Sequence, residues 1–186
     1  LDTGHALEFT VEAGRPDRIT REKLAVLRSH GITRISINPQ TMNQKTLDLI
    51  GRRHTVEMVK EKFYLARELG FDNINMDLIM GLPEETLEDV DRTLEEIRAL
   101  SPDSLTVHSL AIKRAARLNM FKEEYSGLHI VNTPEMIERS AACARSMGMK
   151  PYYLYRQKNM AGNFENVGYA RPGKACIYNI LIMEEM

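Results

Sequence analysis

The feature that most limits the fold of this sequence is a regular alternation of short β-rich runs with longer runs of helical periodicity. We expect strands at residues 8–12, 34–38, 73–79 and 105–110, with a weaker one at 152–155. Strands separated by helical segments of this length are joined by crossovers and run parallel. The alternation therefore predicts an α/β fold, either an open parallel sheet or part of a (β/α)8 barrel.

The helical runs carry recognisable start and stop signals. Thr20, Thr55, Thr86 and Thr133 each stand where an N-cap residue is expected, and Asp89 completes a capping box with Thr86. Glycine or a Ser-Pro pair follows each periodic stretch. We expect helices over residues 20–31, 44–50, 55–70, 86–101 and 133–148. Residues 113–132 are less regular, and we interpret them as a solvated helix or loop.

Composition excludes several classes of protein. The 186 residues carry a net charge of −1 with no basic face, so we expect no nucleic-acid partner. No apolar run approaches the roughly 20 residues that span a bilayer, so we expect no membrane span. Two cysteines, Cys143 and Cys176, lie too far apart in sequence for a local metal knuckle. A disulfide stays open, but the plainer interpretation is a reduced, cytoplasmic protein.

The two ends of the chain and a change near residue 150 suggest its organisation. The first residue is Leu1, a strand-like run follows almost at once, and the last residues are apolar. We therefore expect a fragment truncated at its N-terminus. After Lys150, aromatic and polar residues replace the β/α rhythm. We predict one domain over residues 1–150 and a separate C-terminal segment over residues 151–186.

Polar residues stand at or near the carboxyl ends of the expected strands, where parallel α/β proteins bind ligands. Each of them alone could be a cap, a turn residue or a satisfied structural group, but four strands with such residues favour a shared site. They are Glu12, Asn38 with Gln40, Asp77 and His108.

Asp77 is the strongest of these candidates for a functional residue, because it interrupts an apolar strand. An unpaired carboxylate there would cost several kcal/mol. A ligand could satisfy it, or a structural ion pair with a nearby arginine such as Arg52 or Arg53. The sequence contains no GxGxxG or Walker-type pattern, so a phosphate cradle is not indicated. The turn Gly81-Leu82-Pro83 is by itself only a tight strand-to-helix connection.

Several motifs, in order and spacing, resemble those of the radical S-adenosylmethionine family of oxygen-independent coproporphyrinogen III oxidases. They are EFTVEAG at 8–14, GITRISINPQ at 31–40, IGRRH at 50–54 and GFDNINMDLIMGLP at 70–83. A later segment, YARPGKACIYN at 169–179, resembles the part that follows the barrel, and with residues 151–166 it is most similar to the clostridial coproporphyrinogen dehydrogenase branch.

This resemblance implies a partial (β/α) barrel that holds a [4Fe–4S] cluster and S-adenosylmethionine. Reductive cleavage of the cofactor would give a 5′-deoxyadenosyl radical. In the family this radical abstracts hydrogen from a propionate side chain, which loses carbon dioxide and becomes a vinyl group in haem biosynthesis. By the same resemblance, Glu12, Gln40, Arg52 and Asp77 would contact the cofactor, and Ile79 would pack near its adenine. A porphyrinogen substrate and an electron-donor protein would be the partners.

The three-cysteine cluster motif of this family, CxxxCxxC, is absent from the sequence, and Cys143 and Cys176 do not replace it. In the family the motif lies upstream of the stretch that matches here. We therefore assign no metal ligand and no catalytic residue, and we expect the chain alone to be inactive. His108 stands where many relatives carry tyrosine, so its role stays open.

Two alternatives to the oxidase also stay open, a haem chaperone of the same superfamily and a cofactor-free β/α-barrel binding protein. The aromatic segment after Lys150 would suit a planar tetrapyrrole with propionates, or it is simply strand and core. Its residues are Tyr152, Tyr153, Tyr155, Arg156 and Lys158. With an unpaired sheet edge, we expect the chain alone to be marginally stable or to associate.

Overall fold

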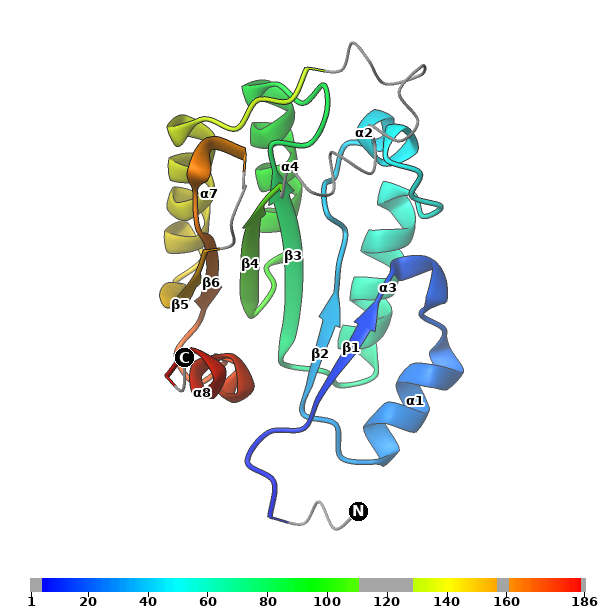
Figure 1. Ribbon diagram of the computed structural model, residues 1–186. Coiled ribbons are helices and arrows are strands. Elements are labelled where there is room, and N and C mark those ends of the chain that lie inside the picture. The colour runs from blue at the N-terminus through cyan, green and yellow to red at the C-terminus, as the bar shows by residue number, and fades with distance from the viewer. Residues whose placement is uncertain (1–4, 111–128, 157–160, 185–186) are drawn as a thin grey trace.

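The structure is a computed structural model that describes residues 5–110, 129–156 and 161–184. Its centre is a six-stranded sheet with the strand order β1-β2-β3-β4-β6-β5 (Figure 1). Strands β1 to β4 are parallel, as the alternation predicted. The strands are β1 (Thr10–Gly14), β2 (Arg34–Ile37), β3 (Ile74–Met80), β4 (Ser104–Ser109), β5 (Lys150–Tyr155) and β6 (Asn166–Ala170).

Strand β6 lies between β4 and β5 and is antiparallel to both. Strand β5 therefore runs in the same direction as β1 to β4. The weaker strand expected at 152–155 is confirmed as β5, whereas β6 was not predicted. Both strands after residue 149 continue the main sheet, and the proposed division at residues 150/151 stays a prediction.

The five expected helices are confirmed, and their caps explain where they begin. The side chains of Thr20, Thr55, Thr86 and Thr133 each accept a hydrogen bond from a backbone N–H three residues later. The capping box of Thr86 with Asp89 is also present. The helices are α1 (Arg21–Ser29), α2 (Gln44–Leu49), α3 (Val56–Glu68), α4 (Leu87–Leu100) and α7 (Pro134–Ser146), with short 3₁₀ turns η1 (Pro16–Arg18) and η3 (Ala161–Asn163).

Helices α1, α3, α4 and α7 all cover one face of the sheet (Figure 1). The side chains of β3 show how the two faces differ. Ile74, Met76, Leu78 and Met80 are almost completely buried in the main apolar core against these helices. Because strand side chains alternate, Asn75, Asp77 and Ile79 point to the opposite face. That face carries the candidate site.

Two differences from the expected elements affect the site. Strand β1 covers Thr10–Gly14 rather than 8–12, since Ala13 still packs against the core and Gly14 pairs with Ile37. Glu12 therefore lies inside the strand and not at its end. The apolar run near the C-terminus forms a helix, α8 (Ile177–Glu184), whose first N–H donates to Glu8 Oε2 at 2.8 Å. Most of the stretch 113–132 lies outside the described residues.

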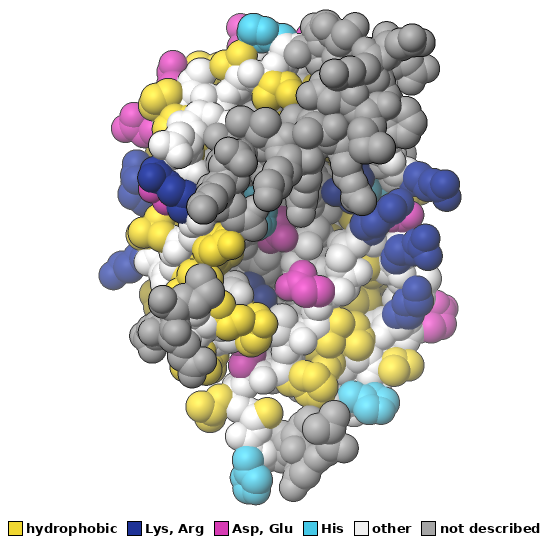
Figure 2. Space-filling view, in the orientation of Figure 1, with side chains coloured by type: hydrophobic (Ala, Val, Ile, Leu, Met, Phe, Trp, Pro, Cys, Tyr) yellow, Lys and Arg dark blue, Asp and Glu magenta, His cyan; other side chains and the backbone are white. Residues whose placement is uncertain are grey.

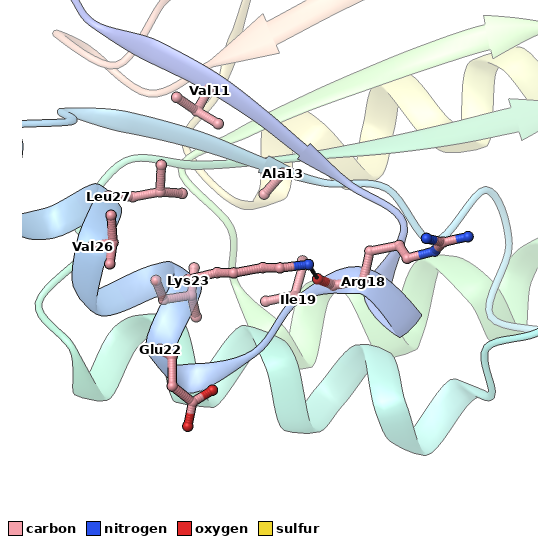
Figure 3. Close-up of a pocket in the computed structure, with 9 residues that line it drawn as sticks. Val11, Ala13, Arg18, Ile19, Glu22, Lys23, Val26 and Leu27 are labelled. Atoms are coloured by element: carbon pink, nitrogen blue, oxygen red, sulfur yellow. Dashed lines mark hydrogen bonds between the residues drawn. The ribbon is translucent and has the colours of Figure 1, made fainter.

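Strand β1 forms the edge of the sheet and pairs with β2 alone among the described strands. Beside it, an apolar groove of about 450 Å³ opens between β1 and α1 (Figure 3). Val11 and Ala13 face Leu27 across this groove, and Val26 is 55% exposed. Such an edge and groove are the reason why we expect the chain alone to associate or to be marginally stable, which stays a prediction.

Candidate functional site

The candidate site lies on the face of the sheet opposite helices α1, α3, α4 and α7, which Figure 2 shows as hollowed near its middle, with acidic side chains there. Strand alternation brings polar side chains from four strands to this face. They are Glu12 of β1, Arg34 and Ser36 of β2, Asn75 and Asp77 of β3, and Ser104, Thr106 and His108 of β4. We call this surface the open face.

Asn75 is the centre of a hydrogen-bond network across the open face. Its amide donates to Asp77 Oδ1 at 2.6 Å and to Ser36 Oγ at 3.4 Å, and its Oδ1 accepts from Thr106 Oγ1 at 3.3 Å. The Ser36 hydroxyl donates to Asn38, whose amide reaches Glu12 Oε2 at 3.5 Å. The network therefore connects the carboxylates of Glu12 and Asp77, which are 65 positions apart in sequence.

The second oxygen of Asp77 faces His108 Nε2 at 3.7 Å. The sequence left open whether a ligand or an arginine satisfies this carboxylate. Among the described residues no arginine lies within ion-pair distance of Asp77, and its polar neighbours are Asn75 and His108. The carboxylate is only partly buried, so it remains accessible to a ligand.

Gln40 and Ile79 lie directly beside Asp77 because the chain after β2 pairs with β3. The Gln40 N–H donates to the Asp77 carbonyl at 3.0 Å, and the Ile79 N–H donates to the Gln40 carbonyl at 2.9 Å. Gln40 has a φ of 72°, a left-handed conformation that few non-glycine residues adopt. The Ile79 side chain packs in a small separate apolar cluster with Leu82, Leu110 and Ala161.

Arg52 and His54 lie in the loop after α2, and His54 contacts the residue before Gln40. The Arg52 N–H donates to the Leu47 carbonyl at 2.8 Å, which fixes the start of this loop. His54 is completely buried, and its Nε2 lies 3.2 Å from the carbonyl of Pro39, the residue before Gln40. Burial, and to a lesser degree the nearby Arg52 guanidinium, lower the pKa of His54. A neutral imidazole thus supports the turn that carries Gln40.

The segment after Lys150 also contributes to the open face. The rings of Tyr152 and Tyr153 pack edge to face with centroids 4.9 Å apart. The Tyr153 ring lies directly over Gly168, where no side chain could fit, and burial raises the pKa of Tyr153 to about 12. Tyr155 is partly buried. Arg156 instead pairs with Glu165 at 2.9 Å, and Lys158 lies outside the described residues.

Neither cysteine takes part in the hydrogen-bond network around Asn75. Cys143 is buried between α7 and α4, and its thiol contacts the Leu94 carbonyl at 3.5 Å. Cys176 is buried beside Glu8, just before α8. Burial raises the pKa of both thiols. Within residues 5–110, 129–156 and 161–184, no cluster of three His, Cys, Asp or Glu side chains could hold a metal ion.

Sequence reasoning missed five residues of the open face, namely Arg34, Ser36, Asn75, Ser104 and Thr106. Asn75 stands two residues before Asp77, and Arg34 and Ser36 stand four and two residues before Asn38, so the period of two could have identified them. The burial of Arg34 gave no signal in the sequence. Arg34 is 2% exposed, its Nη2 donates to Ser104 Oγ at 3.3 Å, and its Nε has no hydrogen-bond partner.

The model of the Radical SAM superfamily matches residues 2–97, about half of the chain. The chain belongs to this superfamily. Over its whole length it is 52% identical to the oxygen-independent coproporphyrinogen-III oxidase-like protein HemZ of Bacillus subtilis (strain 168), of which it covers 37%. The E. coli coproporphyrinogen III oxidase HemN, a radical SAM enzyme, has a similar structure, with a TM-score of 0.70 and 26% identity over 89% of this chain and 36% of that one.

A second group of relatives carries a different name. The chain is 39% identical to the haem chaperone HemW of Bacillus subtilis over 57% of its own length and 28% of that protein. The chain therefore spans between 28% and 37% of the length of these three relatives.

The described residues fit part of the cofactor set of a radical SAM protein. Carboxylate oxygens at Glu12 and Asp77 suit hydroxyl and amino groups, and an arginine such as Arg52 suits a carboxylate. Ile79 and its cluster give an apolar surface suited to an aromatic base. The described residues do not fit an iron–sulfur cluster, because no set of thiolates converges there. The part of the chain that the structure describes thus contains residues suited to S-adenosylmethionine but no set of ligands for the cluster.

No helix among the described residues is both long and apolar enough to cross a bilayer.

Proposed function

We propose that this chain is the cofactor-binding part of a radical SAM oxidoreductase that acts on coproporphyrinogen III in haem biosynthesis. The observation that carries the proposal is the network that connects Glu12 and Asp77 beside Gln40 and Ile79, on a chain 52% identical to a coproporphyrinogen oxidase-like protein. In the full-length protein, a hydrogen atom of the substrate's propionate side chain would pass to the 5′-deoxyadenosyl radical, the carboxyl group would leave as carbon dioxide, and the remaining electron would pass to an electron acceptor, which leaves a vinyl group. The chain alone would be inactive.

In this proposal each residue of the site contacts a different part of S-adenosylmethionine. Glu12 binds the ribose or methionine part, and Gln40 and Asp77 hold further polar groups. Arg52 binds the methionine carboxylate, and Ile79 packs against the adenine. When bound, the cofactor supplies the radical chemistry, and these residues orient it and keep it on the open face. The iron–sulfur cluster would be held by cysteines elsewhere in the protein, and a cytoplasmic electron-donor protein would reduce it.

The part of the open face around Arg34, Tyr152 and Tyr153 favours a substrate that carries carboxylates. Arg34 is a buried cation for which no ion pair with a carboxylate exists among the described residues. Its charge acts on Tyr152 and Tyr153, so the three side chains lie near one another. The two phenols, whose pKa values are raised by burial, offer aromatic surface to a propionate-bearing ring, and the buried guanidinium beside them adds positive charge.

The test is anaerobic turnover of coproporphyrinogen III by the full-length, cluster-reconstituted protein with S-adenosylmethionine and a reductant. We expect vinyl product and carbon dioxide in equal amounts. Asp77→Asn should abolish most of the activity, because it removes a charge from the cofactor site. Asp72→Asn is the matched control, since Asp72 lies five residues away on an exposed loop and pairs only with Lys174 at 3.2 Å.

A haem chaperone is the second candidate, and the HemW relatives favour it. A chaperone would bind haem stoichiometrically and give no vinyl product under the same conditions. That outcome would reject the oxidase and leave the cofactor site in place. The cofactor-free alternative loses its support, because the chain belongs to the radical SAM superfamily.

A further inference from the structure

Glu85 is a buried carboxyl group next to the proposed cofactor site, and no ion pair satisfies it among the described residues. It lies in the loop between β3 and α4 and is 7% exposed. The hydroxyl of Thr41 donates to Glu85 Oε1 at 2.6 Å, and Thr46 of α2 is its second hydrogen-bond partner. Glu85 therefore connects three separate segments of the chain.

Thr41 extends this contact into the turn that follows Gln40. Its Oγ1 accepts from the Asn43 N–H at 3.1 Å and lies 3.2 Å from Thr93 Oγ1, which in turn accepts from the Met42 N–H at 3.2 Å. If each hydroxyl donates onward, the chain of hydrogen bonds runs from the Met42 amide to Glu85. Hydrogen bonds arranged in this way polarise and strengthen one another.

The turn needs such support because of the conformation of Gln40. Gln40 has a φ of 72°, and it is not a glycine. A residue with a Cβ keeps this left-handed conformation only when the surrounding structure imposes it. On one side the backbone of β3 holds Gln40 through Asp77 and Ile79. On the other side, the contacts of Glu85, Thr41 and Thr93 hold the next two residues.

We propose that Glu85 is a positioning residue that holds the Gln40 turn in the form that contacts the cofactor. The inference rests on the proposed role of Gln40 at S-adenosylmethionine. The Glu85 side chain accepts a hydrogen bond from the Thr41 hydroxyl, and the side-chain oxygen of a glutamine at this position can accept the same bond.

Charged groups lie close to Glu85 in this loop. Burial raises the pKa of Glu85, and the negative charge of Asp89 adds to this effect, against the opposing hydrogen bonds from Thr41 and Thr46. Asp89 itself pairs with Arg92 and caps α4 at Thr86. Lys45 and Glu84 line a groove next to Asp89 and Arg92.

The experiment measures the affinity of the full-length, cluster-reconstituted protein for S-adenosylmethionine. In Glu85→Gln the affinity should stay close to that of the wild type, because the glutamine oxygen can still accept from the Thr41 hydroxyl. In Glu85→Ala it should be weaker by roughly tenfold, because the Thr41 hydroxyl loses its partner. Glu88→Gln, at an exposed position of α4, should behave as the wild type.

Two results would overturn the proposal. In the first, Glu85→Gln binds as weakly as Glu85→Ala. In the second, Glu85→Ala lowers the thermal stability but leaves the affinity unchanged, which would mean a purely structural role. If the variants bind the cofactor as expected but the wild type does not convert coproporphyrinogen, the proposed substrate fails and the role of Glu85 stands. If the wild type does not bind the cofactor at all, both proposals fail.

Discussion

The two faces of strand β3 have opposite roles although their residues alternate along one chain. Ile74, Met76 and Leu78 point into the core beneath the helices and are fully buried. Asn75 and Asp77 point to the open face, where they bond to each other and to side chains of neighbouring strands. Apolar burial stabilises one face in proportion to its area, whereas the other face keeps polar groups that are only partly satisfied.

This difference separates stability from function along a single strand. A change on the helix-covered face should unfold the protein before it affects any ligand. A change on the open face should affect ligand binding and leave most of the stability in place. Four substitutions test this separation, and they are ordered by their expected effect on stability.

Met76→Ala should have the largest effect. Met76 is fully buried against the helices, and truncation of such a side chain costs about 2–5 kcal/mol in the free energy of unfolding. Urea denaturation of the full-length protein measures it. A loss below about 1 kcal/mol would mean that this face does not hold the core together as described.

Gly168→Ala should have the next largest effect, because the Tyr153 ring occupies the space that a Cβ would need. Overpacking of this kind costs about 1–3 kcal/mol. Gly168→Ala should cost less stability when it is added to a Tyr153→Ala variant than when it is made in the wild type, because the ring that it clashes with is then absent. Additive losses in this double-mutant cycle would show that the ring does not lie over Gly168.

His54 should make the protein sensitive to acid. Its pKa is lowered in the folded state, so the native protein binds fewer protons than the unfolded chain just below pH 6.5. The stability that depends on neutral His54 is present above pH 6.5 and is lost as pH falls towards the lowered pKa. His54→Gln should flatten this part of a plot of melting temperature against pH. An unchanged slope would indicate that another group titrates there.

Asp77→Asn should have the smallest effect on stability, within about 0.5 kcal/mol, because the new side chain keeps an oxygen that can accept from the Asn75 amide. The affinity for S-adenosylmethionine should nevertheless fall, since a charged acceptor becomes neutral. A large loss of stability without a change in affinity would contradict the comparison, because it would show that the open face contributes to stability and not to ligand binding.

Local signals in the sequence predicted most of the elements. Each of the four threonine caps is confirmed, because capping depends only on residues within one turn. Strand β6 was missed because its sequence, NVGYA, contains a glycine and no alternation of its own. It is a strand because β4 and β5 pair with it on both sides. Its glycine is explained only by the Tyr153 ring.

For the candidate site, the sequence identified Glu12, Gln40 and Asp77 from their positions, and the resemblance added Arg52 and Ile79. The roles of all five residues stay predictions. The sequence did not find Asn75, which connects two of them, or Glu85, which lies behind the turn of Gln40. The contacts of Asn75 and Glu85 join segments that are 31 to 44 positions apart, so no local pattern reveals them.

The sequence by itself determined the α/β class, the caps, the order of the parallel strands along the chain and the superfamily. These follow from periodicity, from capping within one turn and from motif spacing. Only the tertiary structure decided that β6 enters between β4 and β5, that Tyr153 covers Gly168, and that a buried carboxyl group supports the Gln40 turn. The reason is physical, because these features depend on which distant side chains come to share one desolvated space, and local sequence does not specify that.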